Sequence, residues 1–540
     1  MLGTLWRLLF RRIAGVRGSG GTEPRRAEVL VSADLSVNRE RIESAFGNSP
    51  DLVTRELRAG ARGRISVLVT HIDGLVDKRL IAEAVVERIT GLQLEWTDPA
   101  QAYEDLKTRL LASSDVEEVE TLGEFISGIA RGDGGVLVDG VAKGLVCALR
   151  GWEQRSVEEP TTESTVRGSK EGFVEALRTN TSLLRRRIVS PQLWIEEVTI
   201  GRITRTRVAI AYIAGVVNED IVEEVRARLK RIDVDAIHES GNIEELIEDA
   251  PFSPFPTIAR TERPDRVAGA LIDGRVAILT DGTPFVLIVP ATFTMFLTSS
   301  EDYYERYFAG SAIRLLRIAA FFISLTLPAF YVALTTYHQE MLPTPLVLSI
   351  AAQREGIPFP AVVEALLMEF VFETLREAGI RLPRVVGQAV SIIGALVVGD
   401  AAIRAGLASP AMVMVVAFTG IASFATPVFS LAISVRLLRF VMTALGGALG
   451  FFGVAMGMFA LLTHLTCLRS FGVPYLEPLA PLVLSDLKDA LVRVPWWAMS
   501  RRPEFTGKKA PIRQAPGLKP RPPSPEREEV QRLLDTEDVR

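Results

Sequence analysis

The chain has 540 residues, of which 48% are hydrophobic, and its mean hydropathy is +0.24. Its length exceeds that of one ordinary domain core, so two or more domains are expected. The formal net charge of −4, from 61 basic and 65 acidic residues, argues against a nucleic-acid-binding protein. Two cysteines, Cys147 and Cys467, and four scattered histidines support neither a disulfide framework nor a metal cluster, and no cofactor is expected.

The first 36 residues are basic. Residues 1–13 are apolar, but Arg7 interrupts them and no small-residue cleavage site follows, which disfavours a signal peptide. They form either a short amphipathic helix that touches a membrane or a frayed basic terminus. Residues 15–36 are rich in glycine and arginine, as is typical of a linker.

Residues 37–150 are predicted to form an α/β subdomain. Residues 64–71 are typical of a buried strand, and residues 77–89 have the apolar spacing of an amphipathic helix. Residues 135–149 contain two apolar runs around Asp139-Gly140, a pattern that predicts a hairpin.

The same order recurs in residues 191–300. Residues 207–218 predict a strand and turn, and residues 219–232 predict a helix. Residues 269–279 predict a hairpin with Asp273-Gly274 in its turn.

Two short matches link the two subdomains. The segment 212–215 occupies the place of 71–74, and Leu-Ile-Asp-Gly at 271–274 resembles Leu-Val-Asp-Gly at 137–140. The pattern indicates either an internal duplication with two copies or a chance similarity between two small α/β units. Residues 151–190 between them predict a connector with a charged helix.

An apolar block extends from residue 318 to residue 467. Residues 283–297 before it are too short to span a bilayer and are expected at its interface. About 20 helical residues cross roughly 30 Å of hydrocarbon. Four segments pass this test: 317–337, 385–405, 410–434 and 440–466. A fifth span is possible through 342–378.

The four spans would place both ends of the block on one side. The large N-terminal part has no export signal, so that side is expected to be cytoplasmic. Arginine placement supports this orientation poorly, because five arginines would then face outward: Arg376, Arg381, Arg384, Arg436 and Arg439. Glycines at 446–457 predict close helix packing in the last span.

The sequence thus predicts an α/β cytosolic N-terminal region of two related subdomains, followed by an all-α multi-span membrane domain. The tail is expected to be disordered, since it becomes basic and proline-rich past Pro503. The predicted divisions are a basic segment and linker (1–36), the first α/β subdomain (37–150), a helical connector (151–190), the second α/β subdomain (191–300), the transmembrane domain (301–480) and a cytoplasmic C-terminal tail (481–540).

Residues 358–378 carry acids in an otherwise apolar helix. Glu369, Glu373 and Glu377 recur every fourth residue and therefore share one helical face. They are either solvated at the membrane surface or line a water-filled vestibule that attracts cations.

The segment 385–405 carries an ionisable residue inside a predicted span, which is a functional-site hypothesis by default. Around the axis of an oligomer, Leu396 would form an apolar constriction and Asp400 an acidic ring that favours cations. Alternatively, Asp400 pairs with Arg404 and Leu396 is ordinary packing. The candidate pore-lining residues, which share one helical face, are Ala389, Ile393, Leu396, Asp400 and Ile403.

Short motifs across residues 155–500 carry a family resemblance. They include Glu-Pro-Thr-Thr-Glu at 159–163, Ser-Pro-Phe-Pro at 253–256, Thr-Glu-Arg-Pro-Asp at 261–265, Asp-Tyr-Tyr-Glu-Arg at 302–306, Pro-Phe-Pro-Ala at 358–361 and Ser-Phe-Gly-Val-Pro-Tyr at 470–475. On these residues the chain closely resembles the A subunits of the GerA-type spore germination receptors of endospore-forming bacteria. The resemblance is weaker over the first subdomain and absent from the tail.

This resemblance implies a receptor subunit, not an enzyme. Such A subunits sit in the inner spore membrane beside a transporter-like B subunit, thought to bind the nutrient, and a lipoprotein C subunit. They are thought to assemble as a ring that forms a nutrient-gated channel for monovalent cations. The implied partners are therefore further copies of this chain, the B and C subunits, and membrane lipid.

Two residues depart from the family pattern. Ser169 stands where a proline is expected after Arg167-Gly168, and Asp400 stands where a glutamine is expected after Gly399. The second difference changes the charge of the candidate pore segment, so ion selectivity does not carry over directly. A non-conducting scaffold subunit and a related A-subunit-like channel without its own germinant specificity remain alternatives.

Overall fold

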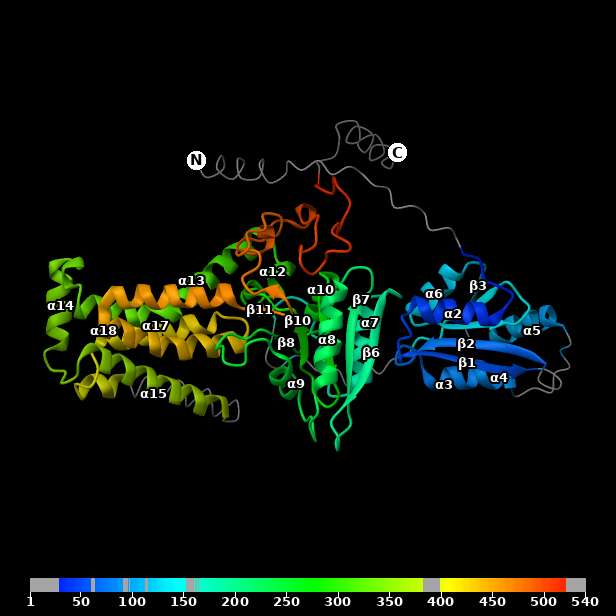
Figure 1. The fold of residues 1–540 in the computed structure, drawn as a ribbon, viewed down its shortest axis with the longest axis horizontal. Helices are drawn as coiled ribbons and strands as arrows, with labels where there is room; N and C mark the ends of the chain where they lie inside the picture. The colour runs from blue at the N-terminus through cyan, green and yellow to red at the C-terminus, as the bar shows by residue number, and fades with distance from the viewer. Residues whose placement is uncertain are drawn as a thin grey trace, which may run out of the picture. The chain divides into compact units, whose positions relative to one another are not determined.

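The computed structural model describes residues 29–59, 64–90, 96, 98–111, 115–151, 160, 163, 165–381 and 399–520. These fall into two compact units: the first holds most of residues 29–150, and the second holds residues 43–52, 73–75 and everything after 150 (Figure 1). The predicted helix at residues 1–13 lies outside the described residues.

The first unit is built on a five-stranded sheet in the order β1-β2-β4-β5-β3, and its described strand pairs are antiparallel. The predicted strand, helix and hairpin are confirmed, although the helix is built from two short α-helical pieces and a π-helical stretch. The elements are α2 (Leu35–Ala45), β1 (Leu52–Ala59), β2 (Ile65–Ile72), α3 (Lys78–Leu80), η1 (Ile81–Val86), α4 (Glu87–Thr90), α5 (Pro99–Leu111), β3 (Val116–Val119), α6 (Leu122–Ala130), β4 (Gly134–Val138) and β5 (Gly144–Cys147).

Close packing of α6 on the sheet depends on glycine. Phe125 on α6 is fully buried. A Cβ atom added at Gly144 would lie 2.9 Å from its ring, so only glycine leaves room for this helix. The strands β4 and β5 beneath it are buried along their whole length.

The second unit repeats this sheet order with β6-β7-β9-β10-β8. The identical plan confirms that the two subdomains have the same architecture. Its α/β elements are α7 (Leu177–Arg187), β6 (Leu193–Ile200), β7 (Thr206–Ile213), α8 (Glu219–Arg231), α9 (Ser240–Ile247), β8 (Ala259–Thr261), α10 (Pro264–Ile272), β9 (Val276–Thr280), β10 (Val286–Val289), α11 (Phe293–Leu297) and α12 (Glu301–Tyr304).

Both faces of this sheet are buried. Along β7, Val208 and Ile210 pack in one apolar cluster with α8 and α9, while Ala209 and Ala211 pack in another with α7 and α10. Strand residues alternate between faces, so a strand covered on both sides must be apolar throughout. This explains the continuous apolar run at 208–213.

The hairpin predicted at 269–279 is wrong. Pro264 begins α10, and the apolar residues before Asp273 belong to the buried face of that helix. Gly274, at φ +82°, ends the helix and is followed by β9. The equivalent of the first subdomain's β4–β5 turn is therefore the turn at Gly282, which has φ +90° between β9 and β10.

The expectation that residues 283–297 lie at a membrane interface is also wrong. β10 pairs with β8 and β9, and all four of its residues are buried. This apolar run is therefore a core strand followed by the short helix α11.

A helical bundle follows in the same unit. It consists of α13 (Tyr307–Thr336), η2 (Gln339–Met341), α14 (Thr344–Arg354), α15 (Ala361–Arg381), α17 (Pro410–Phe424) and α18 (Phe429–Cys467). α13, α15, α17 and α18 run side by side, and α14 lies across the end of the bundle that is far from the sheet (Figure 1).

α18 is a hairpin of two antiparallel arms. Gly450 interrupts it with φ +61° and ψ −145°, and a Cβ atom added at Gly457 would meet Met442 Sδ at 2.7 Å. At the other end, Ser434 Oγ donates to the carbonyl of Pro254, and Ser253 Oγ lies 2.8 Å from His464 Nε2. Residues 434 and 464 would be about 45 Å apart along one straight helix.

This hairpin changes the predicted boundaries of the last two spans. The helix expected at 410–434 ends at Phe424, because Pro427 lacks a donor and restricts the residue before it. The span expected at 440–466 contains the turn at Gly450. The predicted close packing by small residues is confirmed, since a Cβ atom at Gly446 would lie 2.6 Å from the carbonyl oxygen of Ala329 on α13.

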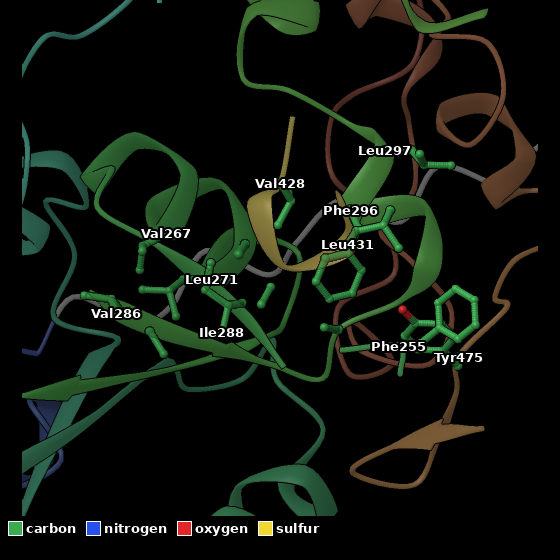
Figure 2. Packing of buried hydrophobic residues seen from close by; sticks show 14 of the residues in the cluster. Phe255, Val267, Leu271, Val286, Ile288, Phe296, Leu297, Val428, Leu431 and Tyr475 are labelled. Atoms are coloured by element: carbon green, nitrogen blue, oxygen red, sulfur yellow. The ribbon is translucent and has the colours of Figure 1, made fainter. Parts of the chain in front are cut away.

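The sheet and the bundle share one apolar core. Val428 and Leu431, where α18 begins, lie close to Leu271 of α10 and Ile288 of β10 (Figure 2). Phe321 and Leu325 of α13 belong to the same cluster. The bundle is thus packed directly against one layer of the second subdomain.

Two helices, α13 and α18, are long and apolar enough to cross a membrane by length and composition within the described residues, and α17 is a shorter apolar helix. The predicted span at 385–405 falls mostly outside the described residues. The described residues before this segment and at its end lie at opposite ends of the bundle. Arg376, before it, donates to Ser423 Oγ. Ala402, near its end, packs with Val332 and Ala361.

The described part of the C-terminal segment is folded, which corrects the expectation of a disordered tail. Its regular elements all lie before Pro503: β11 (Arg469–Ser470), β12 (Val473–Pro474), η3 (Asp486–Asp489) and η4 (Trp496–Ala498). The chain around and just past Pro503 is instead bonded to the end of α10. Thr506 Oγ1 donates to the carbonyl of Asp273 at 2.6 Å, and Arg502 Nε donates to that of Ile272 at 2.8 Å. The composition of this segment predicts disorder. Its polar side chains are nevertheless held in place, because they donate to backbone carbonyls at the end of α10.

Candidate functional site

The bundle encloses a row of charged residues on α15. Glu364 is fully buried, and Ser409 donates to its Oε1 from the backbone nitrogen at 2.6 Å and from Oγ at 2.5 Å. Its other oxygen lies 3.7 Å from Arg354 Nε. A buried carboxylate is retained only where donors and opposite charge compensate the loss of water.

Glu369 and Glu373 follow on the same helix and face the first arm of α18. Glu369 is fully buried, lies 3.6 Å from Arg439 Nε and accepts from Thr443 Oγ1 at 3.4 Å. Glu373 accepts from Arg436 Nη1 at 2.5 Å. We call Glu364, Glu369, Glu373 and their arginine partners the α15 seam.

The seam is only half satisfied. The Oε2 atoms of Glu364, Glu369 and Glu373 are buried, and none of them has a hydrogen-bond donor among the described residues. Each instead lies 3.6 to 4.0 Å from a guanidinium nitrogen, beyond normal hydrogen-bond length. Pairs of this length are electrostatic contacts without a hydrogen bond, so the seam does not fix α15 by directional bonds alone.

The three candidate vestibule residues have different surroundings. Glu369 is buried, Glu373 is half-buried, and Glu377 is exposed. Surface solvation therefore does not describe Glu369. Their role in a vestibule stays a prediction.

Sequence reasoning missed the partners of these acids. The predicted span boundaries place Arg436 and Arg439 in a loop, against the charge bias, yet they lie in α18 and face α15. That violation was itself the available signal, because an arginine inside an apolar helix usually has a buried partner.

The candidate pore face is described only at its end. Ala389, Ile393 and Leu396 lie outside the described residues. Asp400 and Ile403 lie within them, and the side chain of Asp400 is 55% exposed and pairs with Arg404 Nε at 2.9 Å. The i+4 pair that was the alternative is present, and the pore role of these five residues stays a prediction.

A second ionic cluster lies where α13 begins. Asp302 is buried and accepts from Arg314 Nε at 3.1 Å and from Arg317 Nη1 and Nη2 at 3.0 and 3.1 Å. Arg314 also donates to Asp489 Oδ1 at 2.9 Å. We call these four residues the base cluster. It ties α12, α13 and the C-terminal segment together.

The described residues also include potential metal ligands and thiol groups. Within the described residues, no group of three or more His, Cys, Asp or Glu side chains is placed to hold a metal ion. Cys147 is buried and Cys467 exposed, and both are free thiols.

Comparison with known proteins shows the family of this chain. The model of the Bacillus/Clostridium GerA spore germination protein family matches residues 40–505. The chain belongs to this family. Together with two helices long enough to cross a membrane, membership indicates a membrane-associated protein of the germinant receptor A-subunit family.

Several relatives cover nearly the whole chain. Spore germination protein KA of Bacillus subtilis (strain 168) is 49% identical over 494 residues, which are 92% of this chain and 90% of that protein. The uncharacterized membrane protein YfkQ of the same organism is 45% identical over 88% of this chain and 91% of its own length. Spore germination protein GerLA of Bacillus cereus is 38% identical over 86% and 94%.

One solved structure is also similar. The crystal structure of the N-terminal domain of the A subunit of the Bacillus megaterium spore germinant receptor GerK3 is 35% identical in sequence. It covers 50% of this chain and 99% of that domain, with a TM-score of 0.40.

Proposed function

We propose that this chain is the membrane subunit of a spore germinant receptor and that several copies form a nutrient-gated cation channel. The observation that carries the proposal is the α15 seam: buried carboxylates and arginines inside a bundle whose longest helices are apolar enough to cross a bilayer. Ionisable groups at such positions are expensive and are typically retained for transport or gating.

The proposal places the bundle in the inner spore membrane with the N-terminal α/β region in the cytoplasm. The partners would be further copies of this chain, a transporter-like B subunit and a lipoprotein C subunit. Family membership supports the receptor role, since relatives of similar length are named as spore germination proteins. No catalytic role is proposed.

The candidate pore face runs along 385–405. Leu396 would close the pore by excluding water, and Asp400, one turn away, would attract cations. The exposure of Asp400 in the single chain leaves its carboxylate accessible to a neighbouring copy or to ions. Glu369, Glu373 and Glu377 would line the approach to the pore.

Ion flux from liposomes tests the channel. The chain, alone and with its B and C subunits, is reconstituted, and release of K⁺ is followed with and without nutrient. Leu396→Ser should release K⁺ without nutrient, whereas Leu407→Ser, a control beyond the candidate face, should not. If Leu396→Ser remains strictly nutrient-dependent, the constriction lies elsewhere.

The same measurement separates the alternatives. No flux under any condition would indicate a non-conducting scaffold. Flux that never responds to a nutrient would indicate a related channel without germinant specificity.

A further inference from the structure

The C-terminal segment differs in charge from the rest of the chain. Residues 482–519, which we call the strap, contain eight lysines and arginines and three acidic residues, a net charge of +5, whereas the whole chain has −4. Among its cations, Arg501, Lys508 and Lys519 are exposed. The strap therefore presents positive charge on a folded surface.

The strap is fixed beside the first turns of α13. Arg314 of α13 pairs with Asp489, and Ser311 Oγ donates to the carbonyl of Arg493 at 2.9 Å. Arg493 Nη1 in turn donates to the carbonyl of Glu305, just before α13 begins, at 2.8 Å. These bonds hold the strap at the level where a helix that crosses a bilayer would emerge from it.

Large apolar side chains remain exposed on the strap. Leu482 is 65% exposed, Leu484 72% and Trp496 47%. Phe308 on the first turn of α13 is 59% exposed. Apolar groups gathered at the end of a membrane helix, with lysine and arginine nearby, are typical of the bilayer interface.

We propose that the strap is a bilayer-surface contact: its exposed leucines and Trp496 enter the interfacial layer, and its cations bind anionic phospholipid headgroups. Two observations select lipid as the occupant. Trp496 packs against Tyr303, just before α13, with ring centroids 5.9 Å apart, and a net charge of +5 complements an anionic leaflet. The inference rests on α13 crossing the membrane, which is part of the proposed function.

Depth-dependent fluorescence quenching tests this contact in the full chain. A polarity-sensitive fluorophore is attached at Leu484→Cys in a Cys467→Ser background, where the remaining Cys147 is fully buried. The protein is reconstituted in phosphatidylcholine liposomes with or without phosphatidylglycerol, and lipids that carry a quencher near the headgroup are added. Leu482→Cys provides a second labelling site if the first variant does not fold.

Two further labels serve as controls. Ile203→Cys lies in the β6–β7 turn and is even more exposed, at 77%, but belongs to no membrane helix. Phe322→Cys lies on the exposed side of α13, at 44%, and reports whether this helix is in lipid. The first should remain unquenched and the second should be quenched.

We expect the Leu484 label to be quenched by lipid, and several-fold more strongly when phosphatidylglycerol is present. Equal quenching in the two lipids would overturn the role of the cations. A Leu484 label that lipid does not quench, while the Phe322 label is quenched, would overturn the contact, and added protection from aqueous quencher would indicate a protein partner instead. An unquenched Phe322 label would instead show that the membrane assignment itself has failed.

Discussion

The two buried ionic systems of the second unit differ in how well their charges are satisfied. In the base cluster, both oxygens of Asp302 accept hydrogen bonds of 3.0 to 3.1 Å from arginines. In the α15 seam, one oxygen of each glutamate has no donor among the described residues and faces an arginine at 3.6 to 4.0 Å. Asp302, Glu364 and Glu369 are all buried, so solvent does not explain the difference between them.

This difference in hydrogen bonding suggests that the base cluster and the α15 seam differ in how firmly they hold their helices. A buried carboxylate with hydrogen bonds to both of its oxygens costs several kcal/mol of stability when it is removed, and it therefore holds its partners in one arrangement. A half-satisfied network loses less, because its best geometry has not been reached. The base cluster is thus a fixed attachment of α13, and the seam is the place where α15 can move.

Removal of Asp302 should have the largest effect. Asp302→Ala leaves the buried Arg317 without its carboxylate and the buried Arg314 with Asp489 alone, and the free energy of unfolding should fall by about 3–5 kcal/mol. Thermal unfolding in detergent, together with the yield of folded protein, measures this loss. The matched control is Glu305→Ala, three residues on, whose exposed carboxylate should contribute at most about 1 kcal/mol. Similar losses in both variants would remove the basis for a fixed attachment.

Gly450→Val should have the next largest effect, because the turn folds the second arm of α18 back on the arm that carries Arg436 and Arg439. The backbone conformation at Gly450 is one that essentially only glycine adopts. A Cβ atom there would also lie 2.7 Å from His338 Cε1. We expect a loss of about 3 kcal/mol, measured by the same thermal unfolding, with Gly356→Ala as the control because nothing lies within 4 Å of its added Cβ. An unchanged melting temperature for Gly450→Val would contradict a tight hairpin.

Much of this architecture could be predicted from local sequence patterns. The strand at 64–71, the helix at 219–232 and the spacing of turn glycines follow from periodicity, and they led to the same plan for both subdomains. The pattern failed at 269–272, where four apolar residues before Asp273-Gly274 fit a strand as well as a helix end. Only Pro264, a favoured first helical residue, distinguishes the two.

The site was less predictable, for a physical reason. Periodicity places Glu369 and Glu373 on one face of a helix, but it contains no information on which other helix that face meets. The partners Arg436 and Arg439 lie more than sixty residues away and reach α15 only through the packing of α18 against it. The strap was missed for a similar reason: its acceptors are backbone carbonyls of α10, which composition does not reveal.

Glu477 tests whether a buried carboxylate outside the α15 seam can also have one oxygen without a hydrogen-bond donor. It is 4% exposed, its Oε1 has no hydrogen bond in the described structure, and burial raises its pKa to about 7, although Arg275 opposes the shift. The folded protein therefore holds this proton more tightly than the unfolded chain. Stability should fall by about 2 kcal/mol as the pH rises from 5 to 8.

Glu477→Gln should abolish this pH dependence. The variant cannot ionise, so its melting temperature should match that of the original protein at pH 5 and exceed it at pH 8. Glu305→Gln, at an exposed site, should leave the pH profile unchanged. If the original protein and Glu477→Gln lose stability in parallel, Glu477 is already ionised in the folded state, and unsatisfied carboxylates would be confined to the seam.

Glu369→Gln should have the smallest effect, although Glu369 is as deeply buried as Asp302. The pair with Arg439 is 3.6 Å long, Thr443 can still bond the amide oxygen, and Glu373 on the next turn retains a charge near the arginines. We expect a loss of about 1 kcal/mol in thermal unfolding. Glu377→Gln, exposed on the same helix, is the control for α15 and should change stability by less. A loss as large as that of Asp302→Ala would show that the seam holds α15 as firmly as the base cluster holds α13, and α15 could then not be the moving element.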